Sequence, residues 1–144
     1  MKLLKNLLGL GLLASLSIAC GGSPLGERTI TVPLEYEGTD FGPDTATGTA
    51  VINTMTGQVD ITVTGLDILP ATDEYEGWLA GGGEDPQSTA KFSVDASGNG
   101  TSTITLGDIS ESTYERVVLT VEPVPDPSPG PDPRHSIGGN IPAE

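Results

Sequence analysis

The chain has little cysteine, histidine and positive charge. Cys20 is the single cysteine and His135 the single histidine among 144 residues, so no internal disulfide staples the fold and no zinc-type cluster is expected. Six side chains are Lys or Arg, against 20 that are Asp or Glu. That balance argues against a nucleic-acid partner, because phosphate binding needs basic patches. A core must therefore form from Val, Ile, Leu and a few aromatic residues.

The sequence also lacks an apolar run long enough to span a membrane well. The longest, Leu7 to Cys20, has 14 residues, about 21 Å of helix against a hydrocarbon core of ~30 Å. Two lysines, Lys2 and Lys5, precede it, and small residues end it. A charged start, an apolar centre and small residues before a cut are the three regions of a secretory signal. Residues 1–19 are therefore predicted to be a cleaved signal peptide.

The last five residues of this run, Leu16-Ser17-Ile18-Ala19-Cys20, resemble the lipobox of bacterial lipoproteins. The resemblance implies that Cys20 is acylated and becomes the first residue of the mature chain, anchored in the lipid bilayer on the extracytoplasmic side of the cell envelope. Gly21 is not the aspartate that retains some lipoproteins in the inner membrane, which favours the outer membrane or cell surface. The alternative is ordinary cleavage that leaves a free thiol.

Without the leader, four basic side chains remain against 20 acidic ones, a net charge of about −16. The acidity is interpreted as a source of solubility. It also argues against docking on anionic lipid head groups, so the acyl group rather than the protein surface is expected to hold the membrane.

Alternating apolar and polar residues dominate the rest of the chain. Residues 20–27 are predicted to be a lipidated tether. Seven short strands are then expected at 29–36, 49–54, 58–64, 74–80, 90–94, 104–106 and 114–122, separated by Gly, Asp and Pro. Pro33 cannot donate to a ladder, so its strand is predicted to be an edge strand. The pattern predicts an all-β fold, an antiparallel, immunoglobulin-like β-sandwich over residues 28–123.

The C-terminal residues 124–144 are rich in proline and acidic residues. An extended, polyproline-like segment is expected from Pro123 to Pro133. Two interpretations of the end stay open: residues 135–141 return as a last short strand, or the tail is disordered.

Five motifs follow one another in the order of a known family. They are Gly48-Thr49-Ala50-Val51, Gly57-Gln58-Val59, Val63-Thr64-Gly65-Leu66, Tyr75-Glu76-Gly77-Trp78-Leu79 and Val118-Leu119-Thr120-Val121-Glu122-Pro123. This order resembles the extracytoplasmic C-terminal domain of anti-sigma-K factors over about residues 46–123. The resemblance implies a sensing or binding role outside the membrane. The helical sigma-binding domain and spanning helix of that family have no counterpart here, so no direct sigma-factor binding is expected.

Tyr75 and Trp78 are the candidate binding residues. On an exposed sheet face they would form an aromatic patch for a ligand. The alternative, which we favour, is that Trp78 is a core residue of a strand buried on both sides, as tryptophans in sandwiches often are.

No metal or cofactor is expected. Residues Asp95, Ser97 and Asn99 resemble the start of a calcium loop, but Leu106 stands where that loop needs a glutamate. A hairpin turn uses the same residue types, and this interpretation is favoured.

Catalysis is not expected either, because no nucleophile and base stand in a recognisable pattern. The carboxylates are spread along the chain and nothing singles out a hydrolytic pair. Glu122 is predicted to pair with Arg116 or Arg134, or to end a strand.

Two functions from different classes fit the sequence. The first is a non-enzymatic binding or sensor module whose partner is another envelope protein or a small ligand. The second is a structural envelope lipoprotein that acts as a passive spacer. Exposed apolar or aromatic surface would favour the first, and uniformly charged faces the second.

Overall fold

The computed structural model describes residues 22–38 and 41–143. The predicted signal peptide, the predicted lipid-attachment residue Cys20 and Gly21 lie outside these residues. Every regular element in the described part is a β-strand, so the predicted all-β class is confirmed. Within the same residues, no helix has the length and apolar character needed to cross a membrane.

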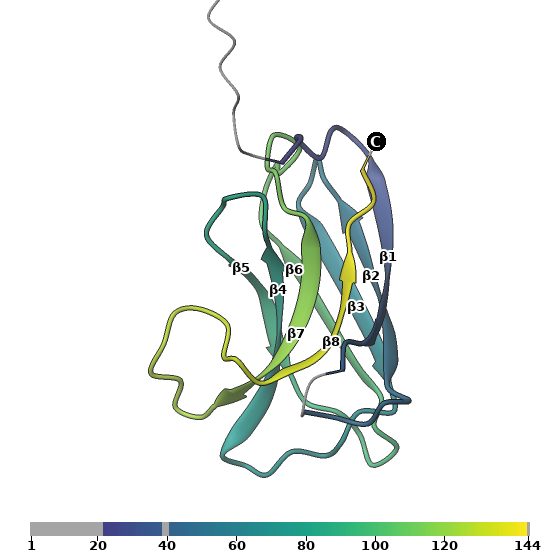
Figure 1. Cartoon of the computed structure of the whole chain (residues 1–144), viewed down its shortest axis with the longest axis vertical. Coiled ribbons are helices and arrows are strands. Elements are labelled where there is room, and N and C mark those ends of the chain that lie inside the picture. Colours follow the sequence, from purple (N-terminus) through teal and green to yellow (C-terminus); the bar gives the residue numbers. More distant parts are fainter. Residues whose placement is uncertain (1–21, 39–40, 144) are drawn as a thin grey trace, which may run out of the picture.

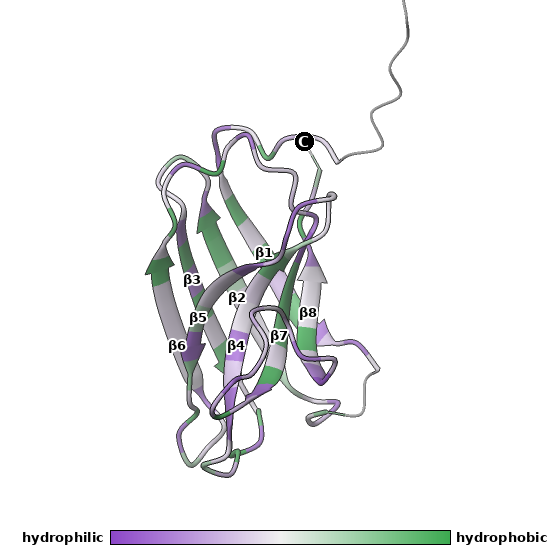
Figure 2. Ribbon diagram, turned by 90° about the vertical axis from the view of Figure 1, so that its left-hand side faces the viewer, coloured by the Kyte–Doolittle hydropathy of each residue, from purple (hydrophilic) through white to green (hydrophobic). Residues whose placement is uncertain are grey.

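The described residues form eight strands (Figure 1). In chain order they are β1 (Thr29–Tyr36), β2 (Thr47–Asn53), β3 (Gln58–Thr64), β4 (Asp73–Ala80), β5 (Gln87–Phe92), β6 (Gly100–Thr105), β7 (Arg116–Pro123) and β8 (His135–Asn140). Figure 2 shows bands of hydrophobic and polar residues alternating along several of them. In β1, for example, Ile30, Val32 and Leu34 are buried and the residues between them are exposed.

The strands form one antiparallel sheet in the order β5-β4-β7-β8-β1-β2-β3-β6. It is nearly closed and barrel-like, because its two end strands, β5 and β6, pack against each other (Figure 1). Seven strands in two sheets were expected. The difference comes from the C-terminal segment, which returns as β8 and pairs with both β7 and β1. The domain therefore extends beyond residue 123, through Asn140.

The edge-strand prediction for β1 is wrong, because β1 lies between β8 and β2. Pro33 pairs with Thr49 of β2, whereas the ladder with β8 contains only Glu35 and Tyr36 of β1. The proline therefore sits before the short second ladder and removes no donor from it.

The core lies on the inner face of the sheet and reaches past β1 towards the N-terminus. Leu25 is only 2% exposed and belongs to this core. Its backbone N–H donates to the Ser112 carbonyl at 2.8 Å, and the Gly26 N–H donates to the Ser110 carbonyl at 2.9 Å. Residues 25 and 26 were predicted to belong to a flexible tether. They are instead fixed to the domain, because burying the Leu25 side chain away from water lowers the free energy of the folded chain.

Two adjacent strands, β4 and β7, are buried on both faces. On the outer face, away from the core, the segment after β7 folds back over them: the Asp132 N–H donates to Glu122 Oε1 of β7 at 2.8 Å. Asp126 of the same segment lies 3.6 Å from the ammonium of Lys91 on β5. Figure 2 views the molecule from this side.

Candidate functional site

The two aromatic candidates lie on opposite faces of β4. Tyr75 is 1% exposed, faces the core, and stacks on Phe92 with 5.8 Å between the ring centroids. Trp78 is 3% exposed, lies outside the core cluster, and donates from Nε1 to Thr120 Oγ1 at 2.8 Å. Three positions along a strand reverse the face, so the two rings do not form one patch. Their burial is the arrangement expected of a strand covered on both sides.

Thr120 and Glu122 continue the series of hydrogen bonds that begins at Trp78. The Thr120 hydroxyl donates to Glu122 Oε1, which also accepts the Asp132 N–H. Glu122 is 1% exposed. Its second oxygen, Oε2, is buried and accepts no hydrogen bond from any described residue.

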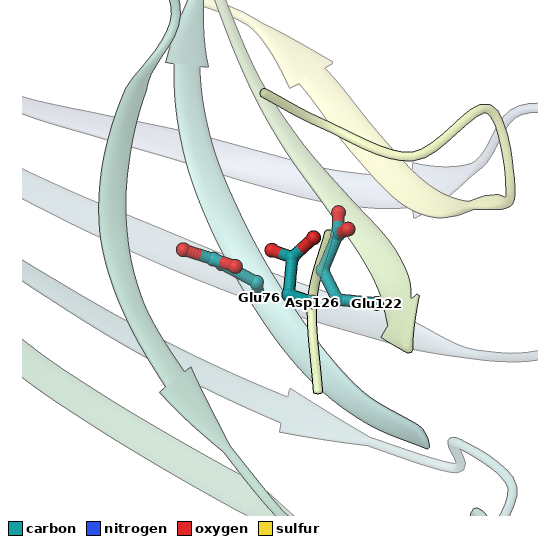
Figure 3. A group of neighbouring side chains, drawn as sticks. All are labelled: Glu76, Glu122 and Asp126. Atoms are coloured by element: carbon teal, nitrogen blue, oxygen red, sulfur yellow. The ribbon is translucent and has the colours of Figure 1, made fainter. Parts of the chain in front are cut away.

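Three carboxylates meet on this outer face, and together they form the outer acidic cluster: Glu76 of β4, Glu122 of β7 and Asp126 of the following segment (Figure 3). One oxygen of each lies within 4.8 Å of the others. Glu76 is 4% exposed and accepts a hydrogen bond from the Ser88 hydroxyl through Oε1. Oxygen donors arranged in this way are the ligands that hard cations prefer.

Lys91 is the cation beside the outer acidic cluster. Its Nζ lies 2.7 Å from Glu74 Oε1, 3.5 Å from Glu76 Oε2 and 3.6 Å from Asp126 Oδ2. The hydrogen bond to Glu74 is the main reason that the pKa of Lys91 is raised. The ammonium therefore stays charged and binds Glu74 most closely, at the edge of the cluster.

A β-bulge positions the residues that β5 contributes. Gly77 pairs with Ala90 but the next residue, Trp78, pairs with Ser88, which leaves Thr89 as an extra residue. In a regular strand Ser88 and Lys91 would point to opposite faces, because they are three positions apart. The bulge brings both to Glu76. Bulges often aim side chains in this way near functional sites.

The calcium-loop candidate is folded as a tight turn before β6. Asp95 Oδ1 accepts the backbone N–H groups of Ser97 at 2.8 Å and of Asn99 at 2.9 Å. These bonds, that of Asn99 first, lower the pKa of Asp95. Gly98 has a φ of +77°, which glycine adopts without strain. The carboxylate is thus used to close the turn, as the favoured interpretation expects.

Glu122 pairs with neither of the arginines that the sequence suggested. Arg116 binds Glu37, and Arg134 lies 2.9 Å from Asp73 and 3.1 Å from Asp132. Glu122 lies next to the last residue of β7, which agrees with the other alternative, a residue that ends a strand.

A second feature is a pocket of about 110 Å³ where β4 begins, lined by apolar side chains together with the polar residues Asp73, Glu74 and Ser93. The apolar residues that line it include Ile68, Leu69, Pro70, Tyr75, Phe92 and Val94. Ile68 is 65% exposed beside it.

Comparison of the chain with protein-family models, with curated proteins and with solved structures finds no match.

Proposed function

We propose that this chain is a lipid-anchored, non-enzymatic binding module on the extracytoplasmic side of the cell envelope. In this proposal it resembles the C-terminal domain of anti-sigma-K factors without the sigma-binding part. In this proposal the part of the sheet that contains β4 and the part that contains β3 face each other as the two layers of an immunoglobulin-like sandwich. Close packing of the two parts supports this, since a Cβ on Gly77 of β4 would come within 2.7 Å of Ile61 Cδ1 on β3.

The N-terminal entry and the start of β4 lie at opposite ends of the domain (Figure 1), and the pocket lies at the start of β4. Gly26 enters at the end that also carries the turn between β2 and β3, where its carbonyl accepts the Thr54 hydroxyl at 2.6 Å. We name this end the anchor pole. Ile68 follows β3 and marks the other end, the far pole. The seven residues of β3 separate the two by about 20 Å at ~3.3 Å per residue. An anchor at Cys20 therefore leaves the pocket facing away from the bilayer.

The single observation that carries a binding role is the exposed apolar side chain of Ile68 beside the pocket at the far pole. A pocket of about 110 Å³ is smaller than the roughly 300–1,000 Å³ of sites for cofactors and drug-sized ligands. It fits one apolar side chain or a group of similar size, which favours a protein partner in the envelope. Exposed apolar surface is where such contacts form. A passive spacer gives no role to Ile68.

The anchoring part is tested by Cys20→Ala. The variant should leave the membrane fraction or stall before cleavage, because stable anchoring needs acyl chains. Membrane fractionation and the intact mass of the protein are the measurements. An unchanged mass and an unchanged membrane fraction would rule out lipidation.

The binding part is tested by Ile68→Asp, with Met55→Asp as the matched control. Both side chains are exposed, at 65% and 56%, but Met55 lies at the anchor pole. Cross-linking in intact envelopes should capture a partner with the wild type and with Met55→Asp, and lose it with Ile68→Asp. Equal capture by all three proteins would favour the passive spacer.

A further inference from the structure

We propose that the outer acidic cluster is a calcium site, with Glu76, Glu122 and Asp126 as its protein ligands. The proposal is independent of the lipid anchor and of the far pole. It rests on the geometry and burial of three side chains that come from two strands and the segment after β7 (Figure 3).

Unsatisfied oxygens inside the cluster are the first argument. Glu122 Oε2 and Glu76 Oε2 are both buried and accept no hydrogen bond from the described residues. Glu76 Oε2 has only Lys91 Nζ at 3.5 Å. A buried carboxylate oxygen needs a partner to offset the loss of water. A cation held between the three carboxylates would supply such a partner.

The balance of charge is the second argument. Among the described residues, Lys91 forms ion pairs with Glu74, Glu76 and Asp126, and none with Glu122, the third member of the outer acidic cluster. Lys91 lies closest to Glu74, at 2.7 Å, and its side chain is 37% exposed at the edge of the site. One cation at the rim leaves most of the negative charge at the centre uncompensated.

The donor set and its spacing point to calcium. All three ligands are carboxylates, the hard oxygen donors that suit Ca²⁺, Mg²⁺ and Mn²⁺. Opposite oxygens around Ca²⁺ lie about 4.6–5.2 Å apart, and around Mg²⁺ about 4.0–4.2 Å. Oxygens that lie within 4.8 Å of one another fit around one calcium ion, whereas Mg²⁺ usually keeps several of its waters and uses only one or two carboxylates. Water can complete the coordination of calcium because the Asp126 side chain is 15% exposed.

Bound calcium would also connect three parts of the fold. Glu76 belongs to β4, Glu122 to β7, and Asp126 to the proline-rich segment before β8. The ion would hold that segment on the outer face and add to the hydrogen bond between Asp132 and Glu122. Because only the folded chain brings these ligands together, calcium should raise its thermal stability.

Trp78 offers a direct readout. It is the single tryptophan of the chain and is joined to Glu122 through Thr120 by two hydrogen bonds. Terbium, a luminescent substitute for calcium, should therefore be sensitised by Trp78 in the full-length protein purified in detergent. Calcium should displace it, and magnesium at the same concentration should not.

Asp126→Asn is the decisive variant, because Asp126 lies outside the strands and its loss should not unfold the sheet. It should weaken calcium binding by at least about tenfold, since ligand charge sets calcium affinity. Asp95→Asn, in the calcium-like turn, is the matched control and should bind as the wild type does. Lys91→Gln should bind more tightly, because a competing cation is removed.

The outcomes separate clearly. A terbium signal that calcium displaces and that Asp126→Asn weakens supports the site. No Trp78-sensitised signal in the folded wild type, or a signal unchanged in Asp126→Asn, overturns it. Loss of binding in Asp95→Asn with binding retained in Asp126→Asn would place the ion in the turn instead and would also overturn it.

Discussion

Tyr75 and Trp78 each bury an aromatic ring and satisfy its polar atom in a different way. The Tyr75 hydroxyl donates to the Asp67 carbonyl at 2.9 Å, at the edge of the core. The Trp78 N–H donates to Thr120, on the outer face. Large aromatic side chains contribute apolar burial as long as the polar atom finds a partner. Both rings are therefore expected to contribute to stability rather than to an exposed binding surface.

Replacing Tyr75 by phenylalanine should change how stability depends on pH. Burial, reinforced by the charge of Asp67, raises the pKa of Tyr75 to about 12. The folded protein thus keeps a proton that the unfolded chain loses above pH 10, so the free energy of unfolding falls as pH rises from about 10 to 12. Tyr75→Phe should flatten this part of the profile. At neutral pH it should lose about 1 kcal/mol with the hydrogen bond.

Urea unfolding at pH 7 and at pH 11 measures both effects. Tyr36→Phe is the control. Tyr36 is the partly buried last residue of β1, and its replacement leaves Tyr75 and the Tyr75 hydrogen bond in place. An equal alkaline decline in Tyr75→Phe and the wild type would show that another group causes the decline.

At the scale of elements, β4 packs closely against β3 across the core. A Cβ on Gly77 would overlap Thr89 Oγ1 and come within 2.7 Å of Ile61 Cδ1. Gly77→Ala should therefore destabilise the protein by about 1–3 kcal/mol, the usual cost of overpacking. Gly130→Ala is the matched control, since its Cβ would meet nothing within 4 Å. Urea unfolding compares the two, and equal stability would contradict the close packing of the strands.

Most of the strands could be predicted because their alternation is regular. The predicted ranges 29–36 and 58–64 coincide with β1 and β3. β8 could not be predicted firmly, because Gly138 and Gly139 carry no side chain that shows a period. The structure explains one of them: a Cβ on Gly139 would overlap the Pro33 carbonyl of β1. Without β8, the two halves of the sheet look like separate layers.

The outer acidic cluster could not be predicted for a different reason. Glu76 and Glu122 are 46 positions apart, and only the β4–β7 register and the fold of the following segment bring them to Asp126. The bulge at Thr89 adds a second difficulty, since period-two reasoning places Ser88 and Lys91 on opposite faces. Strand alternation alone places Glu74, Glu76 and Trp78 on one face of β4, and this is the part of the site that the local sequence pattern contains.

For the molecule as a whole, the fixed position of Leu25 would limit how far a domain anchored at Cys20 can stand from a membrane. Five residue steps separate Cys20 from Leu25, at most about 18 Å of extended chain. Leu25 is held by the core and by Ser112. A lipidated Cys20 would therefore keep the anchor pole close to the bilayer, with the far pole about 20 Å further away along β3.

This geometry predicts unequal quenching at the two poles. If acylation occupies the Cys20 sulfur, Met55→Cys or Ile68→Cys supplies the single free thiol for a fluorescent label. In vesicles with a quencher on the lipid head groups, the label at residue 55 should be quenched more strongly than the label at residue 68, because quenching falls steeply with distance. Both positions are exposed, so labelling should be comparable. Detergent-dissolved protein gives the unquenched reference. Equal quenching at the two positions would mean that the domain lies on its side or moves freely, and that the short tether does not orient the far pole outwards.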